Sequence, residues 1–254
     1  MTKFDWLGAK PVAHRGLHQP ENGIIENTIS AIVAASRAGF AVEIDVQVTK
    51  DGEAVCFHDE TLDRLTSENG LVSNRTLSEL TKIPIKDAVD GDKIPSLAMV
   101  LNEIGGATPI YIELKSKFDD DTTIAKAVMK TIKNYRGPLA LMSFDPRFFE
   151  VLEDGRPSYA VGQVSYRHDD EEAQNLNPLF RLLRRFCFPA FQHDLDFVAY
   201  NADHLPEFGP RLFRLRGKVL SWTVRSDEKW DEISPYAQQM IFEGFIPKLR
   251  PNRL

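Results

Sequence analysis

Short apolar runs alternate along this chain with longer segments of helical period. The runs that predict strands lie at residues 11–14, 42–46, 54–58, 109–114, 139–143, 160–164, 197–200, 219–224 and 239–242. Several of them are apolar on both faces, as expected for strands covered by helices on one side and by a packed barrel core on the other. The alternation therefore predicts an α/β fold with a parallel sheet.

The helices follow from apolar residues spaced three and four apart. This spacing predicts helices at residues 27–38, 97–104 and 122–135, and shorter ones at 146–153 and 227–238. Gly39 is expected to end the first helix. Ser96 is suited to cap the start of the second, which Gly105 and Gly106 terminate.

The length of 254 residues suits one barrel or two small domains. No linker rich in Pro, Gly or Ser divides the chain, so we expect a single domain over residues 1–254, a TIM-type (β/α)8 barrel. Nine strands are one too many for it. The second and third are too close for a helical crossover and flank the turn signal Lys50-Asp51-Gly52. We therefore expect an irregular, hairpin-like excursion near residues 46–58, and we interpret the polar segment 61–93 as a small insertion on the rim.

Charged and imidazole side chains gather where the first four predicted strands end. Because the carboxyl ends of barrel strands open on one mouth, where barrel enzymes carry their chemistry, these side chains are predicted to converge. They are His14 and Arg15, then Glu43 and Asp45, then His58 and Asp59, and finally Glu113 and Lys115.

The carboxylates predict a metal site. Glu43 and Asp45 are two residues apart in a strand, so they share a face and repel each other unless a cation, a proton or solvent relieves the charge. Glu113 from a nearby strand completes a set of hard oxygen ligands suited to Mg²⁺ or Ca²⁺. Ion pairs with buried lysine or arginine are an equally weighted alternative for the two carboxylates alone.

His14 and His58 form a candidate acid/base pair. Each alone would be more readily explained as a structural histidine, but two imidazoles beside a carboxylate cluster favour proton transfer. The other histidines are expected at the surface: His18, His168, His193 and His204.

Two cations complete the set. Arg15 offers a planar fork that fits a phosphate. Lys115 shares a strand face with Glu113, and the alternative for it is a plain salt bridge to Glu43 or Asp45. A metal, two cations and two imidazoles together fit chemistry at phosphorus, where charge on oxygen must be stabilised.

These motifs resemble those of the glycerophosphodiester phosphodiesterase family. The matching stretches are HRG at residues 14–16, ENT at 26–28, EIDVQVTKDG at 43–52, HDETLDR at 58–64 and IELK at 112–115. The resemblance implies a barrel that hydrolyses a glycerophosphodiester to sn-glycerol 3-phosphate and an alcohol. It implies these roles: Glu43, Asp45 and Glu113 as ligands of Mg²⁺ or Ca²⁺, His14 and His58 as acid and base, Arg15 as phosphate clamp and Lys115 as site cation.

Three further features belong to this picture. Glu26 is expected to cap the first helix as much as to serve chemistry. Trp222 either stacks on substrate at the mouth or lies in the core, with equal weight. Residues 167–196, with an acidic run at 169–172, form an ordinary outer helix in the favoured interpretation, and a lid or a lipid-facing amphipathic helix in the alternative.

The end of the chain departs from the family pattern. A strand is expected at residues 239–242, but the polar residues that usually follow it are missing from residues 240–247.

Two other functions remain alternatives. One is a lysophospholipase D or sphingomyelinase-type phosphodiesterase on the same barrel, and the other is a noncatalytic phosphate-ester binding protein. The net charge of −6 argues against binding to nucleic acid or to anionic lipid through the overall field, and it says nothing about local patches. The expected partner is the small-molecule substrate that the resemblance implies, and no nucleic acid. The first residues show no signal peptide and no stretch is long enough to span a bilayer, so we expect a cytoplasmic enzyme. Cys56 and Cys187 imply no disulfide scaffold, and Cys56 is expected in the core.

Overall fold

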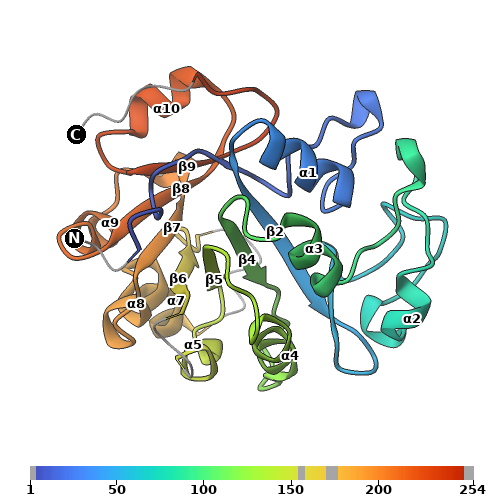
Figure 1. Cartoon of the computed structure of the whole chain (residues 1–254). Helices are drawn as coiled ribbons and strands as arrows, with labels where there is room; N and C mark the ends of the chain where they lie inside the picture. Colours follow the sequence, from blue (N-terminus) through green and yellow to red (C-terminus); the bar gives the residue numbers. More distant parts are fainter. Residues whose placement is uncertain (1–3, 154–157, 170–176, 249–254) are drawn as a thin grey trace. The chain divides into compact units, whose positions relative to one another are not determined.

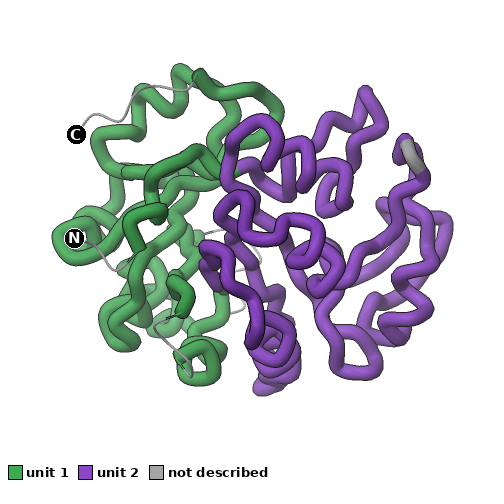
Figure 2. The backbone as a smooth tube through the Cα atoms, viewed as in Figure 1, with its two compact units in different colours: residues 1–12, 142–254 green, residues 13–141 purple. Residues whose placement is uncertain are grey.

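The computed structural model describes residues 4–153, 158–169 and 177–248. Strands and helices alternate along the chain (Figure 1). The backbone forms two compact units: unit 1 comprises residues 1–12 and 142–254, and unit 2 comprises residues 13–141 (Figure 2). The short strand β1 (Val12–Ala13) and strand β5 (Leu139–Ser143) lie where the chain passes from one unit to the other.

Unit 2 is built around three strands: β2 (Ala41–Val48), β3 (Ala54–Cys56) and β4 (Ile110–Leu114). β2 and β4 are parallel, and their residues are buried on both faces as predicted. The helices of this unit are α1 (Ile29–Arg37), α2 (Leu77–Leu80), α3 (Leu97–Ile104) and α4 (Thr123–Ile132).

The excursion after β2 is a hairpin, as the turn signal predicts. The parallel part of β2 ends at Val46, and the strand then continues in antiparallel pairing with β3, where Val46 faces Cys56. Gly52 takes a positive φ of 74° in the connecting turn. β2 is therefore longer than predicted, and Glu43 and Asp45 lie within it rather than at its end.

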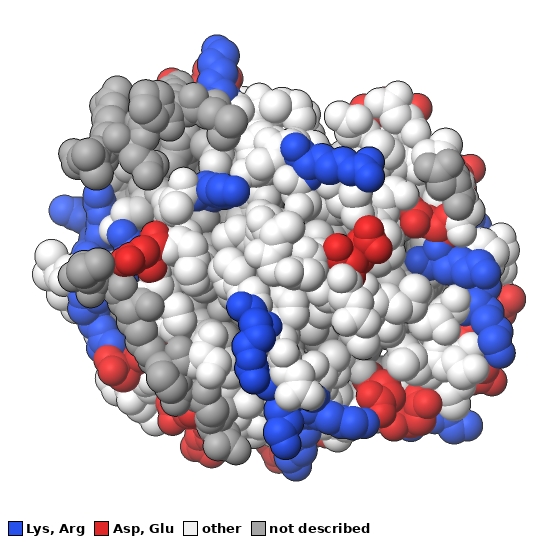
Figure 3. Space-filling model, in the orientation of Figure 1, with Lys and Arg blue, Asp and Glu red and all other residues white. Residues whose placement is uncertain are grey.

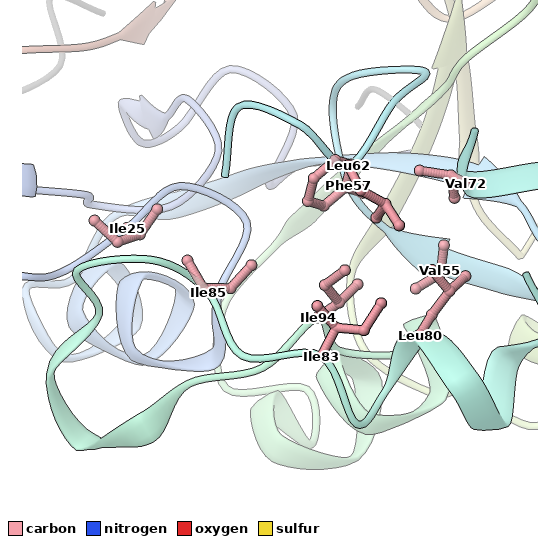
Figure 4. Packing of buried hydrophobic residues seen from close by; sticks show 9 residues of the cluster. All are labelled: Ile25, Val55, Phe57, Leu62, Val72, Leu80, Ile83, Ile85 and Ile94. Atoms are coloured by element: carbon pink, nitrogen blue, oxygen red, sulfur yellow. The ribbon is translucent and has the colours of Figure 1, made fainter. Parts of the chain in front are cut away.

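A small apolar cluster lies beneath the segment 61–93 (Figure 4). Side chains of this segment, among them Leu62, Leu80 and Ile83, pack against Val55 of β3 and against Phe57. The segment contains α2 and two 3-10 turns, η2 (Val72–Asn74) and η3 (Val89–Gly91). The cluster thus fixes a long, largely polar loop next to β3.

The ends of α1 and α3 follow the sequence signals, whereas α10 (Asp227–Ile233) ends five residues earlier than predicted. The Thr28 and Ser96 side chains accept hydrogen bonds from backbone N–H groups of the first turns of α1 and α3. Gly39 follows α1 with φ of 82°, and Gly105 ends α3 in the left-handed conformation that glycine adopts without strain. α4 ends at Ile132, three residues earlier than predicted.

Unit 1 holds four parallel strands: β6 (Ala160–Ser165), β7 (Phe197–Asn201), β8 (Lys218–Val224) and β9 (Gln239–Phe242). Its helices are α5 (Arg147–Leu152), α7 (Pro178–Arg185), α8 (Phe188–Gln192), α9 (Phe208–Phe213) and α10 (Asp227–Ile233). The acidic residues 170–172 of the predicted run lie outside the described residues.

The topology is that of the predicted (β/α)8 barrel with one extra strand. The strand order is β1-β9-β8-β7-β6-β5-β4-β2-β3, with an additional β1–β2 pairing, and β3 is the extra strand. Within the described ranges, every helix is too short or too polar to cross a bilayer.

One expectation about the histidines is wrong. His168 is buried, with 2% of its surface exposed, and its ring packs 3.9 Å from the ring of Tyr166. The side chains of His18, His193 and His204 are partly exposed. Cys56 is buried as expected, and both cysteines are free thiols.

Candidate active site

Three carboxylates from two neighbouring strands meet in unit 2. The parallel register places Asp45 of β2 opposite Glu113 of β4, and Glu43 precedes Asp45 by two residues on the same face. Each residue offers a ligand oxygen within 4.8 Å of the other two, and all three side chains are buried. The geometry that a shared cation requires is thus present.

The Glu43 carboxylate fits a cation ligand most clearly. Its Oε2 accepts a hydrogen bond of 2.8 Å from the Arg15 backbone N–H. Its Oε1 is buried and has no hydrogen-bond partner within the described part of the chain. Burial, together with the charges of Asp45 and Glu113, raises the pKa of Glu43 well above its usual range. A divalent cation would satisfy the unpaired oxygen and relieve this repulsion.

Two cations already flank the carboxylates. Lys115 Nζ lies 2.7 Å from Asp45 Oδ1 and 2.5 Å from Glu113 Oε1, and Arg15 Nε lies 3.3 Å from Asp45 Oδ2. Burial opposes ionisation of both Asp45 and Lys115. Nevertheless, the charges of Lys115 and Arg15 hold the pKa of Asp45 below its usual value, and the charges of Asp45 and Glu113 raise the pKa of Lys115. If all three carboxylates are ionised, the two cations leave one negative charge, which a proton on Glu43 or a further cation would balance.

His58 is oriented by its neighbour. Its Nδ1 lies 2.8 Å from Asp59 Oδ1, and the amide of Gln47 donates to the His58 and Asp59 carbonyl oxygens. Burial lowers the pKa of His58, which favours the neutral imidazole. With Nδ1 held by Asp59, Nε2 is the nitrogen that can exchange a proton with a substrate.

Arg64 and Glu26 connect His58 to Arg15. The Arg64 guanidinium binds Asp59 at 2.6 and 2.9 Å and Glu26 at 2.8 and 2.9 Å, and Glu26 Oε1 also accepts from Arg15 Nη1 at 2.9 Å. The hydrogen bond from Arg64 has the largest effect on Asp59 and, with the one from His58, lowers its pKa to about 2. Partial burial acts in the opposite direction. The expected capping role of Glu26 is wrong, because Thr28 caps α1 by accepting from the Ala31 N–H.

Asn27 is a further residue of the site, one that was assigned no role from the sequence. Its Nδ2 donates to Asp45 Oδ2 at 2.9 Å, and its Oδ1 accepts from the Asp45 N–H at 3.0 Å. It adopts φ of 57°, a left-handed conformation that asparagine tolerates better than most residues. The available signal was its place in the ENT motif, and Arg64 was likewise present in HDETLDR.

Seven of the eight predicted site residues belong to unit 2. His14 directly precedes Arg15, is partly exposed, and its charge influences Asp45. Trp222 is the exception, because it lies in β8 of unit 1. Its side chain is half-buried, its Nε1 donates to the Ala199 carbonyl at 3.0 Å, and its ring meets Phe144 edge-on at 5.4 Å.

An acidic ligand set on parallel strands, flanked by two cations and a histidine oriented by an aspartate, defines a barrel protein with a divalent-metal type of site. Comparison with known proteins specifies it further. The family model for the glycerophosphoryl diester phosphodiesterase family matches residues 14–245. The chain belongs to this family and is an enzyme of it, in agreement with the resemblance seen in the sequence.

Individual relatives agree with this assignment. A glycerophosphodiester phosphodiesterase of Caldanaerobacter subterraneus subsp. tengcongensis is 38% identical over 159 residues, which make up 59% of this chain and 64%, slightly under two thirds, of that protein. The protein YhdW of Bacillus subtilis is 38% identical over 227 residues, covering 85% of this chain and 86% of YhdW. The solved structure of an Oleispira antarctica phosphodiesterase in complex with the product sn-glycerol-3-phosphate has a TM-score of 0.74 at 20% identity, covering 92% of each chain. This likeness confirms the TIM-type barrel.

Proposed function

We propose that this enzyme hydrolyses glycerophosphodiesters to sn-glycerol 3-phosphate and an alcohol, and that the reaction depends on Mg²⁺ or Ca²⁺ held by Glu43, Asp45 and Glu113. The observation that carries the proposal is the buried carboxylate cluster with the unpaired Glu43 Oε1. Family membership and the names of the relatives support the substrate class. The bound ion would stabilise negative charge on the phosphoryl oxygens.

Arg15 and Lys115 are the proposed phosphate ligands of the protein itself. Arg15 is partly exposed, at 19% of its side chain, and is held between Glu26 and Asp45, so its guanidinium is fixed in place before substrate arrives. Lys115 is similarly accessible, at 20%. A pre-oriented fork and an ammonium offset the charge that builds on phosphorus-bound oxygens without reorganisation during the reaction.

His58 and His14 are the proposed proton carriers. His58, kept neutral by burial, accepts the proton of the substrate hydroxyl neighbouring the phosphodiester as that hydroxyl attacks phosphorus. His14 donates a proton to the departing alcohol as its P–O bond breaks. The product of this step is a cyclic glycerol phosphate, which water opens with the two histidines exchanging roles. Rapid quenching of wild-type turnover is expected to trap the cyclic phosphate, and its absence at every time point contradicts this route.

The distribution of charged side chains on the surface bears on the class of substrate. On the face shown in Figure 3, Lys and Arg side chains are interspersed with Asp and Glu and separated by uncharged surface. Mixed charge of this kind supports a small-molecule substrate rather than nucleic acid, whose binding requires a continuous basic surface. A cytoplasmic location remains a prediction.

The deciding experiment is a coupled assay for glycerol 3-phosphate with several glycerophosphodiesters. Turnover is expected with glycerophosphocholine or glycerophosphoethanolamine, to disappear with a chelator, and to return with Mg²⁺ or Ca²⁺. Activity on lysophospholipid alone would instead identify the lysophospholipase D alternative, and substrate bound but unturned in the presence of metal would identify a binding protein. His14→Ala and His58→Ala are expected to fold normally and to lose turnover.

A further inference from the structure

Six large apolar side chains are exposed on three consecutive helices of unit 1. Leu179 on α7, Phe208 on α9 and Leu215 after α9 expose 63%, 64% and 83% of their surface. Single exposed apolar residues are common on soluble proteins, but several on adjoining elements mark an interaction site. The full set is Leu179, Leu182, Phe188, Phe208, Leu212 and Leu215.

Apart from Phe188, these side chains follow one face of α7 and one face of α9, and Phe186 joins the two. On α7, Leu179 and Leu182 are spaced to share a helix face with Phe186, which directly follows the helix. The Phe186 ring meets the Phe208 ring edge-on at 6.2 Å, which joins α7 to α9. The join is tight, because a side chain at Gly209 would come within 2.6 Å of the Phe186 backbone.

On α9 the apolar side chains follow the same kind of spacing. Phe208 is followed four residues later by Leu212 and seven residues later by Leu215, which places all three on one side of the helix and its following turn. We call the set of exposed apolar residues on α7, at the start of α8 and on α9 the α7–α9 face.

Arginines lie next in sequence to the apolar residues of this face. Arg181 lies between Leu179 and Leu182, and Arg211 and Arg214 alternate with Leu212 and Leu215. Among the described residues, none of these three guanidiniums forms an ion pair with a carboxylate.

Glu207, the residue before α9, is paired with other arginines. Glu207 binds Arg185 at 3.0 Å and Arg167 at 3.1 Å. Among the residues that the structure describes, the Arg214 side chain donates to the Pro235 carbonyl. The α7–α9 face therefore combines exposed apolar side chains with guanidiniums that have no carboxylate partner within residues 4–153, 158–169 and 177–248.

We propose that the α7–α9 face docks on the surface of an anionic phospholipid membrane. Guanidiniums bind lipid phosphates, while the leucine and phenylalanine side chains enter the boundary between headgroups and acyl chains, the arrangement of an interfacial amphipathic helix. The net charge of −6 opposes adsorption through the overall field, so the local arginines must supply the attraction. A two-fold dimer through this face is disfavoured, because it sets the same arginines against each other.

Sedimentation of the full-length protein with vesicles tests this surface. Binding is expected to vesicles of phosphatidylcholine mixed with phosphatidylglycerol, to be weak with phosphatidylcholine alone, and to fall as salt is added. Each arginine near an anionic surface strengthens binding about fivefold. The triple variant R181Q/R211Q/R214Q should therefore bind roughly 100-fold more weakly. The apolar variant L179S/L215S should also release the protein.

A matched control uses Ile246→Ser, which removes an apolar side chain that is 55% exposed outside the face. It is expected to bind vesicles like the wild type. All of these variants should keep wild-type turnover of a water-soluble glycerophosphodiester, so the docking surface and the catalytic proposal can fail separately. The proposal is overturned if wild-type protein ignores anionic vesicles, if the arginine variant binds them equally well, or if L179S/L215S instead abolishes a dimer of the wild-type chain.

Discussion

Replacing Arg64 by methionine removes the contacts that connect Asp59, the partner of His58, with Glu26, the partner of Arg15. The guanidinium makes bidentate contacts with Asp59, which holds His58, and with Glu26, which holds Arg15. Within the described residues, Arg64 makes no direct contact with Glu43, Asp45 or Glu113. We therefore expect Arg64→Met to act through the orientation of His58 and Arg15.

The expected magnitude follows from exposure and geometry. The Arg64 side chain is 46% exposed, so each of its two ion pairs contributes only a few tenths to about 1 kcal/mol to folding. Loss of both should destabilise the protein by about 1–2 kcal/mol. The effect on turnover should be larger, about 10- to 100-fold in kcat, because residues that orient a catalytic group typically have effects of that size. KM should change less than kcat.

The pH profile distinguishes orientation from general damage. Without Arg64, Asp59 loses the main cause of its lowered pKa but stays ionised at neutral pH. Its negative charge then acts on His58 without compensation and raises the pKa of the imidazole. A base with a raised pKa becomes protonated at a higher pH, so the acid limb of kcat/KM should move upward in pH.

Steady-state kinetics across pH, together with urea unfolding, provide the test. Arg75→Met is the matched control, because Arg75 forms a single surface pair with Glu68 at 3.2 Å in the same unit. The control should match the wild type in rate and pH profile. An Arg64→Met enzyme with unchanged kcat and an unmoved acid limb would refute the proposed role of the Arg64 contacts.

Three other outcomes are expected. The pKa of Glu43 is higher in the folded protein than in the unfolded chain, so the metal-free protein loses stability as the pH rises from the unfolded-state pKa to the folded-state pKa. Mg²⁺ or Ca²⁺ should therefore raise Tm more at pH 8 than at pH 5. This difference should vanish in the Glu43→Gln variant. Asn27→Gly allows the left-handed backbone but removes two hydrogen bonds to Asp45, so the free energy of unfolding should fall by about 1–3 kcal/mol. Asn27→Ala also strains the left-handed backbone and should lower the free energy of unfolding by about 1 kcal/mol more. Urea unfolding measures both values. Leu80→Ala opens a cavity in the cluster of Figure 4 and should lower the free energy of unfolding by about 2–5 kcal/mol. Equal urea midpoints (Cm) for the variant and the wild type would contradict this expectation.

The metal-type cluster is the part of the site that the sequence predicts well. Glu43 and Asp45 must share a strand face, and the apolar run ending in Glu113 must be a neighbouring parallel strand. Strand period is a local rule, and parallel pairing follows from the alternation of strands and helices along the chain, so neither depends on the conformation of the loops.

Contacts made by loops are harder to predict. Arg64 and Glu26 are 38 positions apart, and no periodicity relates them. Their pairing depends on how residues 61–93 fold onto β3 through the apolar cluster. The burial of His168 was missed for a similar reason, because its φ of 56° turns the chain just after β6 and brings the ring against Tyr166.

Two separate parts of the structure stabilise the site: the paired strands β2 and β4, and the small apolar cluster under residues 61–93. Glu43, Asp45 and Glu113 are held by the strand ladder between β2 and β4, whereas the loop with Asp59 and Arg64 rests on Leu62, Leu80 and their neighbours. Partial opening of the apolar cluster would release the histidine end of the site while the strand ladder stays closed. In mild denaturant, turnover should therefore disappear before the capacity to bind a divalent ion does.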